Sequence, residues 1–312
     1  GGAWRHGAME DVAVKTEAHV EERPVASVAD EKLRSDNAAL VAAARAGDVP
    51  LLSHLLRIGA NVSEFDEEGF LPSHAAALAG QEEALRLLLS KNLNVHSCTR
   101  QNDTCIHLAA LSGNDGVLRL TLEACNLMAS STSLSDGNET SCKAELDKAK
   151  AALEATNAGG WTALQLSIIG GQVKRASDKR SLSAPRLRCT QMLLQAGAHP
   201  GRAVRDGWTA LLLASARADV HAVHCLLSSP SAEPTMVHAV TAAGDSPLLL
   251  AAHAGSDACV RLLLAAGACW RHVNSRGLGC FTLAVQGAIR YDGDMSDEVT
   301  AAFERTILTL AA

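Results

Sequence analysis

One short stretch is written twice in this chain: residues 160–167 read GWTALQLS, and residues 207–214 read GWTALLLA. Weaker copies of the part that begins at the Thr occur in the same register, and they start at residues 38, 71, 104, 246 and 279. The first three of these starts are spaced 33 residues apart, and so are the last two. Self-similarity at a fixed period predicts an array of repeated structural units.

Each copy encodes the same small structure. Thr209 stands directly before an apolar run, where its hydroxyl can accept a backbone N–H and begin a helix. Residues 260–264 place apolar side chains along one stripe of a second helix. Gly59, Gly197 and Gly267 can adopt the left-handed conformation that ends such a helix. A unit of this size cannot bury its apolar stripe alone, so neighbouring units must stack into one core.

These units resemble the ankyrin repeat, whose period is 33 residues and whose signature is T-P-L-H-x-A. The resemblance covers residues 36–310. It implies an all-α ankyrin-repeat solenoid of about seven helix-turn-helix units with β-hairpin fingers. We expect residues 31–312 to form this domain and residues 1–30 to form a disordered tail. The resemblance also implies that His74 and His107, at the signature histidine, have a structural hydrogen-bonding role.

Two intervals between copies are much longer than the period, which predicts loop insertions at about residues 127–156 and 172–185. The first insertion opens with a Ser-rich segment and closes with KAELDKAKAALEA, whose good helix formers predict a short extra helix. The second insertion separates the two helices of the fourth unit and is rich in Lys and Arg. Its simplest interpretation is a solvated basic loop.

Within the second insertion, residues 180–185 read RSLSAP. This segment looks like the phosphopeptide that 14-3-3 proteins recognise, with Ser183 as the phosphorylated residue. The Arg three residues before Ser183 also suits a basophilic kinase. The sequence therefore leaves two interpretations open: Ser183 is a phosphosite, or the loop is inert.

Composition excludes several classes of function. The formal net charge of −6 gives no electrostatic reason to expect binding to nucleic acid. The richest apolar stretch, residues 247–270, is interrupted by His253, Asp257 and Arg261, so we expect no membrane insertion. The nine cysteines include no C-x-x-C pair, which argues against a disulfide framework and a zinc ribbon and favours a reducing compartment. We expect the cytoplasm, with the nucleus as the alternative.

The sequence shows no candidate catalytic or cofactor-binding residues, and we expect no enzyme activity. His221 and His224 lie one helical turn apart with Cys225 beside them, a spacing at which two histidines can share a metal ion. No further ligand stands at a suitable spacing, so we expect a solvated helix face and no metal.

The resemblance implies that the fingers and the first helices line a concave groove for partners. The residue before the signature Thr lies at its rim, and Phe70, Trp161 and Trp208 occupy that position. Trp is enriched among interface anchors, and this chain is poor in aromatic residues. Either the two Trp rings anchor a partner, or each ring packs on its neighbouring finger.

Charge is distributed unevenly along the fingers. The finger before the second unit is acidic and includes Glu67 and Glu68, whereas later fingers carry Arg205 and Arg276. A groove that is negative at one end and positive at the other would fix the direction of a protein partner. Scattered solvated charge would explain the same residues.

The predicted function is therefore a non-catalytic protein–protein interaction module that serves as a scaffold, adaptor or regulatory binder. The alternative is the ankyrin-repeat portion of a larger enzyme or channel, such as a kinase, a ubiquitin ligase subunit or an acyltransferase. This alternative arises because the chain begins without Met and ends on the apolar run ILTLAA.

Overall fold

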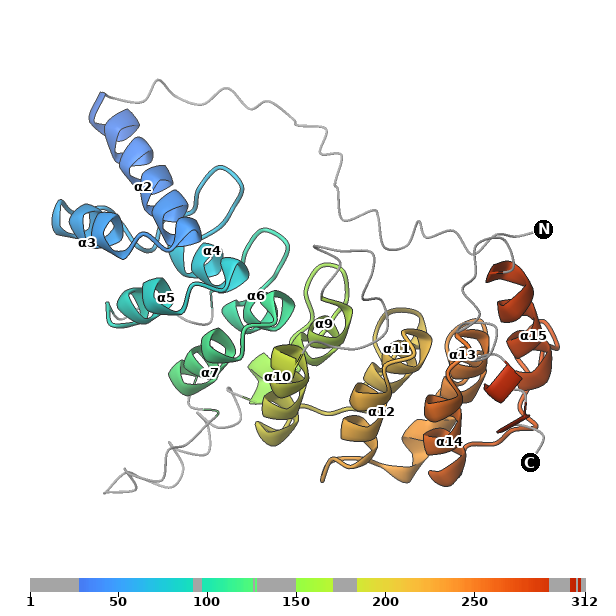
Figure 1. Cartoon of the computed structure of the whole chain (residues 1–312). Coiled ribbons are helices and arrows are strands. Elements are labelled where there is room, and N and C mark those ends of the chain that lie inside the picture. The colour runs from blue at the N-terminus through green and yellow to red at the C-terminus, as the bar shows by residue number, and fades with distance from the viewer. Residues whose placement is uncertain are drawn as a thin grey trace.

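The computed structural model describes residues 28–91, 97–125, 127, 150–170, 184–291, 304–306 and 308–309. Its described helices form two layers that curve gently along the chain (Figure 1). The first layer, on the inner side of the curve, consists of α2 (Val28–Ala46), α4 (Pro72–Ala79), α6 (Cys105–Ser112), α9 (Ala163–Ile169), α11 (Ala210–Ala216), α13 (Pro247–His253) and α15 (Cys280–Tyr291). The second layer consists of α3 (Val49–Arg57), α5 (Glu82–Leu89), α7 (Asp115–Ala124), α10 (Ala184–Gln195), α12 (Val220–Leu227) and α14 (Asp257–Ala265).

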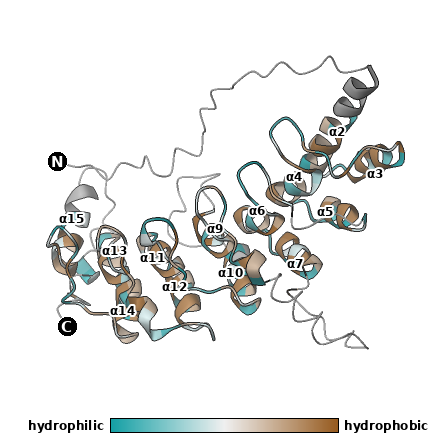
Figure 2. Cartoon of the chain, turned by 180° about the vertical axis from the view of Figure 1, so that it is seen from behind, coloured by the Kyte–Doolittle hydropathy of each residue, from teal (hydrophilic) through white to brown (hydrophobic). Residues whose placement is uncertain are grey.

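Each helix packs on the neighbouring helix of its own layer, and each except α15 packs on a partner in the other layer, as the stacking of repeats requires. The buried apolar side chains form one continuous cluster from Leu40 to Ala284. Hydrophobic residues are concentrated on the helices, whereas the projecting loops are largely hydrophilic (Figure 2). The predicted all-α ankyrin-repeat solenoid is confirmed.

The predicted helix ends are also confirmed. The hydroxyl of Thr209 accepts the backbone N–H of Leu212 at 3.3 Å and begins α11. Gly59, Gly197 and Gly267 have φ angles of 96°, 98° and 89°, in the left-handed region that favours glycine. The sequence therefore specifies both the start and the end of these helices locally.

Parts of the predicted tail and insertions lie outside the described residues, namely 1–27, 128–149 and 171–183. Helix α2 begins at Val28, close to the predicted domain boundary. Residues 150–153 are helical, in agreement with the extra helix expected at the end of the first insertion.

The fingers are tight turns of one repeated geometry. In each finger, the backbone N–H of one residue donates to the carbonyl of the residue four positions later. These pairs are Asp66 to Phe70 (2.9 Å), Thr99 to Asp103 (2.9 Å), Asn157 to Trp161 (3.1 Å), Val204 to Trp208 (3.0 Å), Thr241 to Asp245 (3.1 Å) and Asn274 to Leu278 (3.1 Å). Within the described residues, the strand pairing is limited to an isolated bridge between Cys98 and Thr104, so the expected β-hairpins appear there as turns without strands.

Neighbouring fingers are hydrogen-bonded to each other through their backbones. The N–H of Ala242 donates to the carbonyl of Asp206 at 2.8 Å, and the N–H of Ser275 donates to the carbonyl of Ala243 at 3.0 Å. The fingers approach so closely that a Cβ atom on Gly244, whose φ is 76°, would lie 2.9 Å from the backbone nitrogen of Ser275. Close contact therefore fixes the spacing between these fingers.

Buried polar side chains link the first-layer helices to the following finger. In His107, Nδ1 accepts the N–H of Thr104 at 3.2 Å, so Nε2 carries the proton and donates to the carbonyl of Ala155 at 3.0 Å. His74 makes the same pair of contacts, with the N–H of Leu71 and the carbonyl of Ser97. The structural role that the resemblance implies for both histidines is confirmed.

Gln165 performs the same task with an amide in place of an imidazole. Its Oε1 accepts the N–H of Thr162 at 3.1 Å, and its Nε2 donates to the carbonyl of Trp208 at 3.1 Å. The equivalent positions of the next two units hold the apolar Leu212 and Leu249, which cannot form this link. In the described units, the polar link is thus made by the second, third and fourth units.

The two buried histidines predict how the stability of the fold responds to pH. Burial lowers the pKa of His74 and His107 below the ordinary value of 6.5, so the unfolded chain takes up protons first as the pH falls. The two histidines should therefore cost stability progressively below about pH 6.5. Urea unfolding of the double variant His74→Gln, His107→Gln should show a smaller loss between pH 7 and pH 5 than the parent protein. An unchanged loss would show that other groups carry the acid sensitivity.

Candidate partner-binding surface

Trp161 and Trp208 follow the turns of two consecutive fingers. The N–H of Trp161 donates to Oδ1 of Asn157 at 2.9 Å, which holds the residue at the base of its finger. Both rings are half-buried and pack against the hydrophobic core. Each Trp therefore has a packing role, and only the exposed part of each ring remains for contact with a partner.

Phe70 is also half-buried, and a side chain from α2 in the first layer lies over its ring. The guanidinium of Arg45 in α2 lies 5.7 Å from the centre of the Phe70 ring. The same guanidinium is 2.9 Å from the carboxylate of Glu68. Glu67 is exposed beside this pair. The structure therefore joins Phe70 and Glu68 through Arg45 and leaves Glu67 at the surface.

The predicted basic residues lie on other fingers. Arg205 is exposed on the finger between α10 and α11, 3.9 Å from the carboxylate of Asp206. Arg276 is exposed on the finger between α14 and α15. Glu67, Arg205 and Arg276 therefore do not meet in one site. They are spread along the series of fingers, with negative charge at the N-terminal end.

An aromatic residue that the sequence interpretation missed lies on the last described finger. The side chain of Trp270 is 51% exposed, and the guanidinium of Arg271 lies 4.9 Å from its ring centre. The interpretation considered Trp only at the position before the signature Thr. Trp270 follows the helix-ending pair Gly267 and Ala268, in a loop with cationic residues and no acid, and that combination could have identified it.

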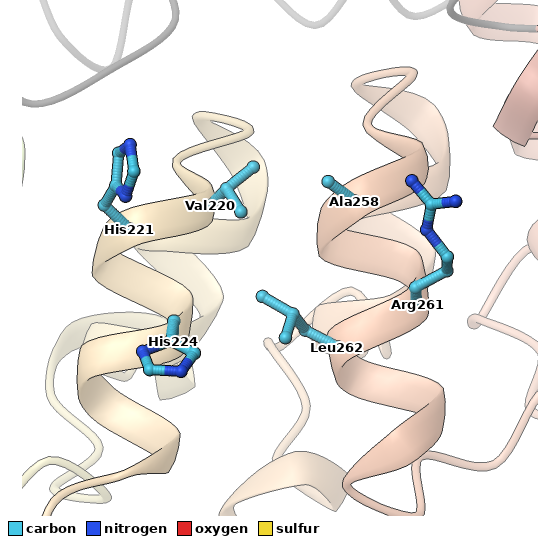
Figure 3. A pocket seen from close by; sticks show the side chains of 6 residues that line it. All are labelled: Val220, His221, His224, Ala258, Arg261 and Leu262. Carbon is cyan, nitrogen blue, oxygen red and sulfur yellow. The ribbon is translucent and has the colours of Figure 1, made fainter.

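A shallow groove runs between α12 and α14 on the second layer (Figure 3). Val220, Ala258 and Leu262 line it, and the exposed imidazoles of His221 and His224 project from α12. Arg261 projects from α14 and is paired with Asp257 at 2.6 Å. The described part of the chain contains no group of three or more His, Cys, Asp or Glu side chains that could hold a metal ion. The arrangement there offers two imidazoles without a third donor.

The described cysteines are free thiols, and most of them are buried. Burial raises the pKa of Cys105 to about 12, and that of Cys125, Cys189 and Cys259 to about 11. These thiols are protonated at neutral pH, so they behave as small apolar groups. None of these four has the low pKa that a cysteine nucleophile requires.

Arg186, in the first turn of α10, directly follows the second insertion in the sequence. Its guanidinium donates to the carbonyls of Leu111 at 3.1 Å and Ser112 at 3.4 Å, at the end of α6, and to the carbonyl of Gly170, at the end of α9. One side chain thus satisfies the free carbonyls of two helix ends. Ser183, the candidate phosphosite, lies outside the described residues and directly precedes α10 in the sequence.

The described residues include no helix long and apolar enough to cross a membrane.

Comparison with known proteins agrees with this architecture. The family described as Ankyrin repeats (3 copies) matches residues 39–131 and 181–276, more than half of the chain. The crystal structure of the ankyrin repeat domain of Bcl-3 is similar, with 21% identity, a TM-score of 0.56, and coverage of 85% of this chain and 97% of that chain. The human ASB11 ankyrin repeat domain is similar with 19% identity, a TM-score of 0.58, and coverage of 85% and 96%. A sequence search of curated proteins finds no match. On its repeats and its fold, the chain belongs to the ankyrin repeat family.

Proposed function

We propose that this chain binds a protein partner on the side formed by its fingers and first-layer helices, as a scaffold, adaptor or regulatory binder. Ankyrin repeats are generally protein–protein interaction modules, and they use extended concave surfaces. The observation that carries the proposal is the hydrogen bonding between neighbouring fingers, such as that from Ala242 to Asp206. The backbone that carries the exposed side chains is held in place before a partner arrives, which reduces the entropy cost of binding. The same role applies if the chain is part of a larger enzyme or channel.

Charge on the fingers supports a directed mode of binding. Glu67 is exposed at the N-terminal end of the series, and Arg205 and Arg276 are exposed further along it. A partner with the complementary order of charges would bind in one direction, and the reverse direction would place like charges together. The half-buried rings of Phe70, Trp161 and Trp208 supply the apolar contacts between these charged positions.

The test uses exposed charges, because truncation of the Trp rings would also remove core packing. Affinity capture with mass spectrometry should identify proteins bound to the parent chain that are lost when Glu67→Lys, Arg205→Glu and Arg276→Glu are combined. Charge reversal chiefly slows association, so the remaining binding should depend less steeply on salt. Melting temperatures should be nearly equal, since Glu67, Arg205 and Arg276 are exposed.

Arg119→Glu is the matched control, because Arg119 is exposed on α7 in the second layer. It should leave the captured proteins unchanged. On an identified partner, replacement of both Trp161 and Trp208 by Ala should weaken binding by at least about 2 kcal/mol if the rings are hot spots. Identical capture by the parent and by the triple variant would contradict the proposed surface.

We also propose that Ser183 is a regulated docking site for a 14-3-3 protein. On either side of the segment, Gly170 ends α9 and Arg186 fixes the first turn of α10. Phosphate on Ser183 would add about −1.5 to −2 charge in a locally basic segment. Ala184 and Pro185 belong to α10, so binding of the whole motif in an extended form would open the first turn of that helix.

Binding to a 14-3-3 protein should therefore require phosphate and disappear in Ser183→Ala. A peptide spanning residues 179–186 with phosphate on Ser183 should bind more tightly than the phosphorylated protein, since the peptide has no helical turn to open. Isothermal titration of both forms measures the difference. If the phosphopeptide has no measurable affinity, the loop is a solvated insertion and the proposal fails.

A further inference from the structure

Large apolar side chains are exposed mainly at the two ends of the solenoid. Leu51, Ile58 and Phe65, in the first unit, are 42%, 57% and 48% exposed. Trp270 and Phe281, in the last described unit, are 51% and 38% exposed. Among described residues between Phe65 and Trp270, Val240, at 42%, is the one large apolar side chain that is exposed. The middle of the array thus has the polar surface of a soluble solenoid, and its ends do not.

The fingers at the two ends carry opposite charge. Residues 64–68 contain four carboxylates and no Lys or Arg, whereas residues 269–279 contain Arg271 and Arg276 and no Asp or Glu. The acidic side chains gather on the first finger around Phe65, where Glu67 is exposed. The basic side chains include Arg271, which stacks on Trp270.

The exposed residues of the C-terminal end lie near the start of α15. The thiol of Cys280 donates to the carbonyl of Trp270 at 3.3 Å, which places Trp270 beside the first turn of that helix. Phe281 is the next residue of α15. A Cβ atom on Gly279 would lie 3.8 Å from the side chain of Val273, which is 51% exposed. We call Trp270, Arg271, Val273 and Phe281 the C-terminal patch.

We propose that copies of this chain associate head to tail, with the C-terminal patch of one copy against the acidic first finger of the next. The first unit and α15 lie at opposite ends of the curved array, so they do not meet within one chain (Figure 1). Apolar side chains with opposite charge around them are complementary in both chemistry and sign. Arg271 pairs with Glu67 of the next copy, and Trp270 packs near Phe65. Such a contact uses two different surfaces, so it leaves one surface free on each end copy and adds further copies until a ring closes.

The C-terminal patch is separate from Trp161 and Trp208, whereas Glu67 belongs to both proposed contacts. The test uses the purified chain alone, so the inference does not depend on the proposed partner binding. Sedimentation velocity of the parent protein should show a weight-average sedimentation coefficient that rises with protein concentration. The rise should be larger at low salt, because exposed charges are screened less there. Trp270→Ala should raise the concentration needed for association by at least about tenfold, as expected for an aromatic anchor.

Charge reversal identifies the pair of surfaces. Arg271→Glu and Glu67→Lys should each weaken association, because each variant places like charges together across the contact. The chain that carries both changes should associate again, because the pair is restored with its signs exchanged. Arg119→Glu, on the exposed face of α7, should behave as the parent protein. All of these charge changes are at exposed positions, so equal melting temperatures should accompany them.

A parent protein that stays monomeric at low salt over the whole concentration range would overturn the inference. So would a double variant that fails to recover, or an Arg119→Glu variant that loses association as the end variants do. Association that is weak in both single variants and restored in the double variant would identify Arg271 and Glu67 as partners across the contact.

Discussion

Contact between neighbouring units is the constraint on which the rest of this structure depends. No helix pair here can bury its apolar stripe alone, so the core exists only because each pair is covered by the next. Two further sets of contacts reinforce the stack: backbone bonds between fingers, such as Ser275 to Ala243, and buried side chains such as His107, which join a helix to the next finger. The surface for partners is a consequence of this stack, since the fingers are held by their neighbours.

The repeat made most of the fold predictable from sequence. Thr209 as a helix start and Gly267 as a helix end are local features, and the structure has both. Gln165 was not recognised as the equivalent of His107, because the link depends on hydrogen-bonding geometry and not on residue type. Asn102 likewise adopts a φ of 59° in its finger, where most of the fingers have glycine.

The candidate site was less predictable, because exposure depends on what packs nearby. The sequence placed Trp161 and Trp208 at the rim, but their packing on the core could not be deduced from their spacing. Trp270 has no special place in the repeat, and its exposure follows from its position on the last described finger. Repeats determine the scaffold, whereas partner choice depends on the side chains that vary between units. The sequence of such a module therefore predicts its fold class, whereas it does not identify its partner.

Gly244 and Gly277 offer the most direct test of stacking as the source of stability. Both have positive φ, 76° and 72°, so Ala at either position introduces similar backbone strain, about 1–2 kcal/mol. A Cβ atom at Gly244 would also press on the backbone of Ser275 in the next finger, whereas one at Gly277 would meet nothing within 4 Å. Urea unfolding should therefore show a larger loss of stability for Gly244→Ala than for Gly277→Ala. Equal losses would contradict the account, because they would mean that contact between fingers adds nothing to the strain within one finger.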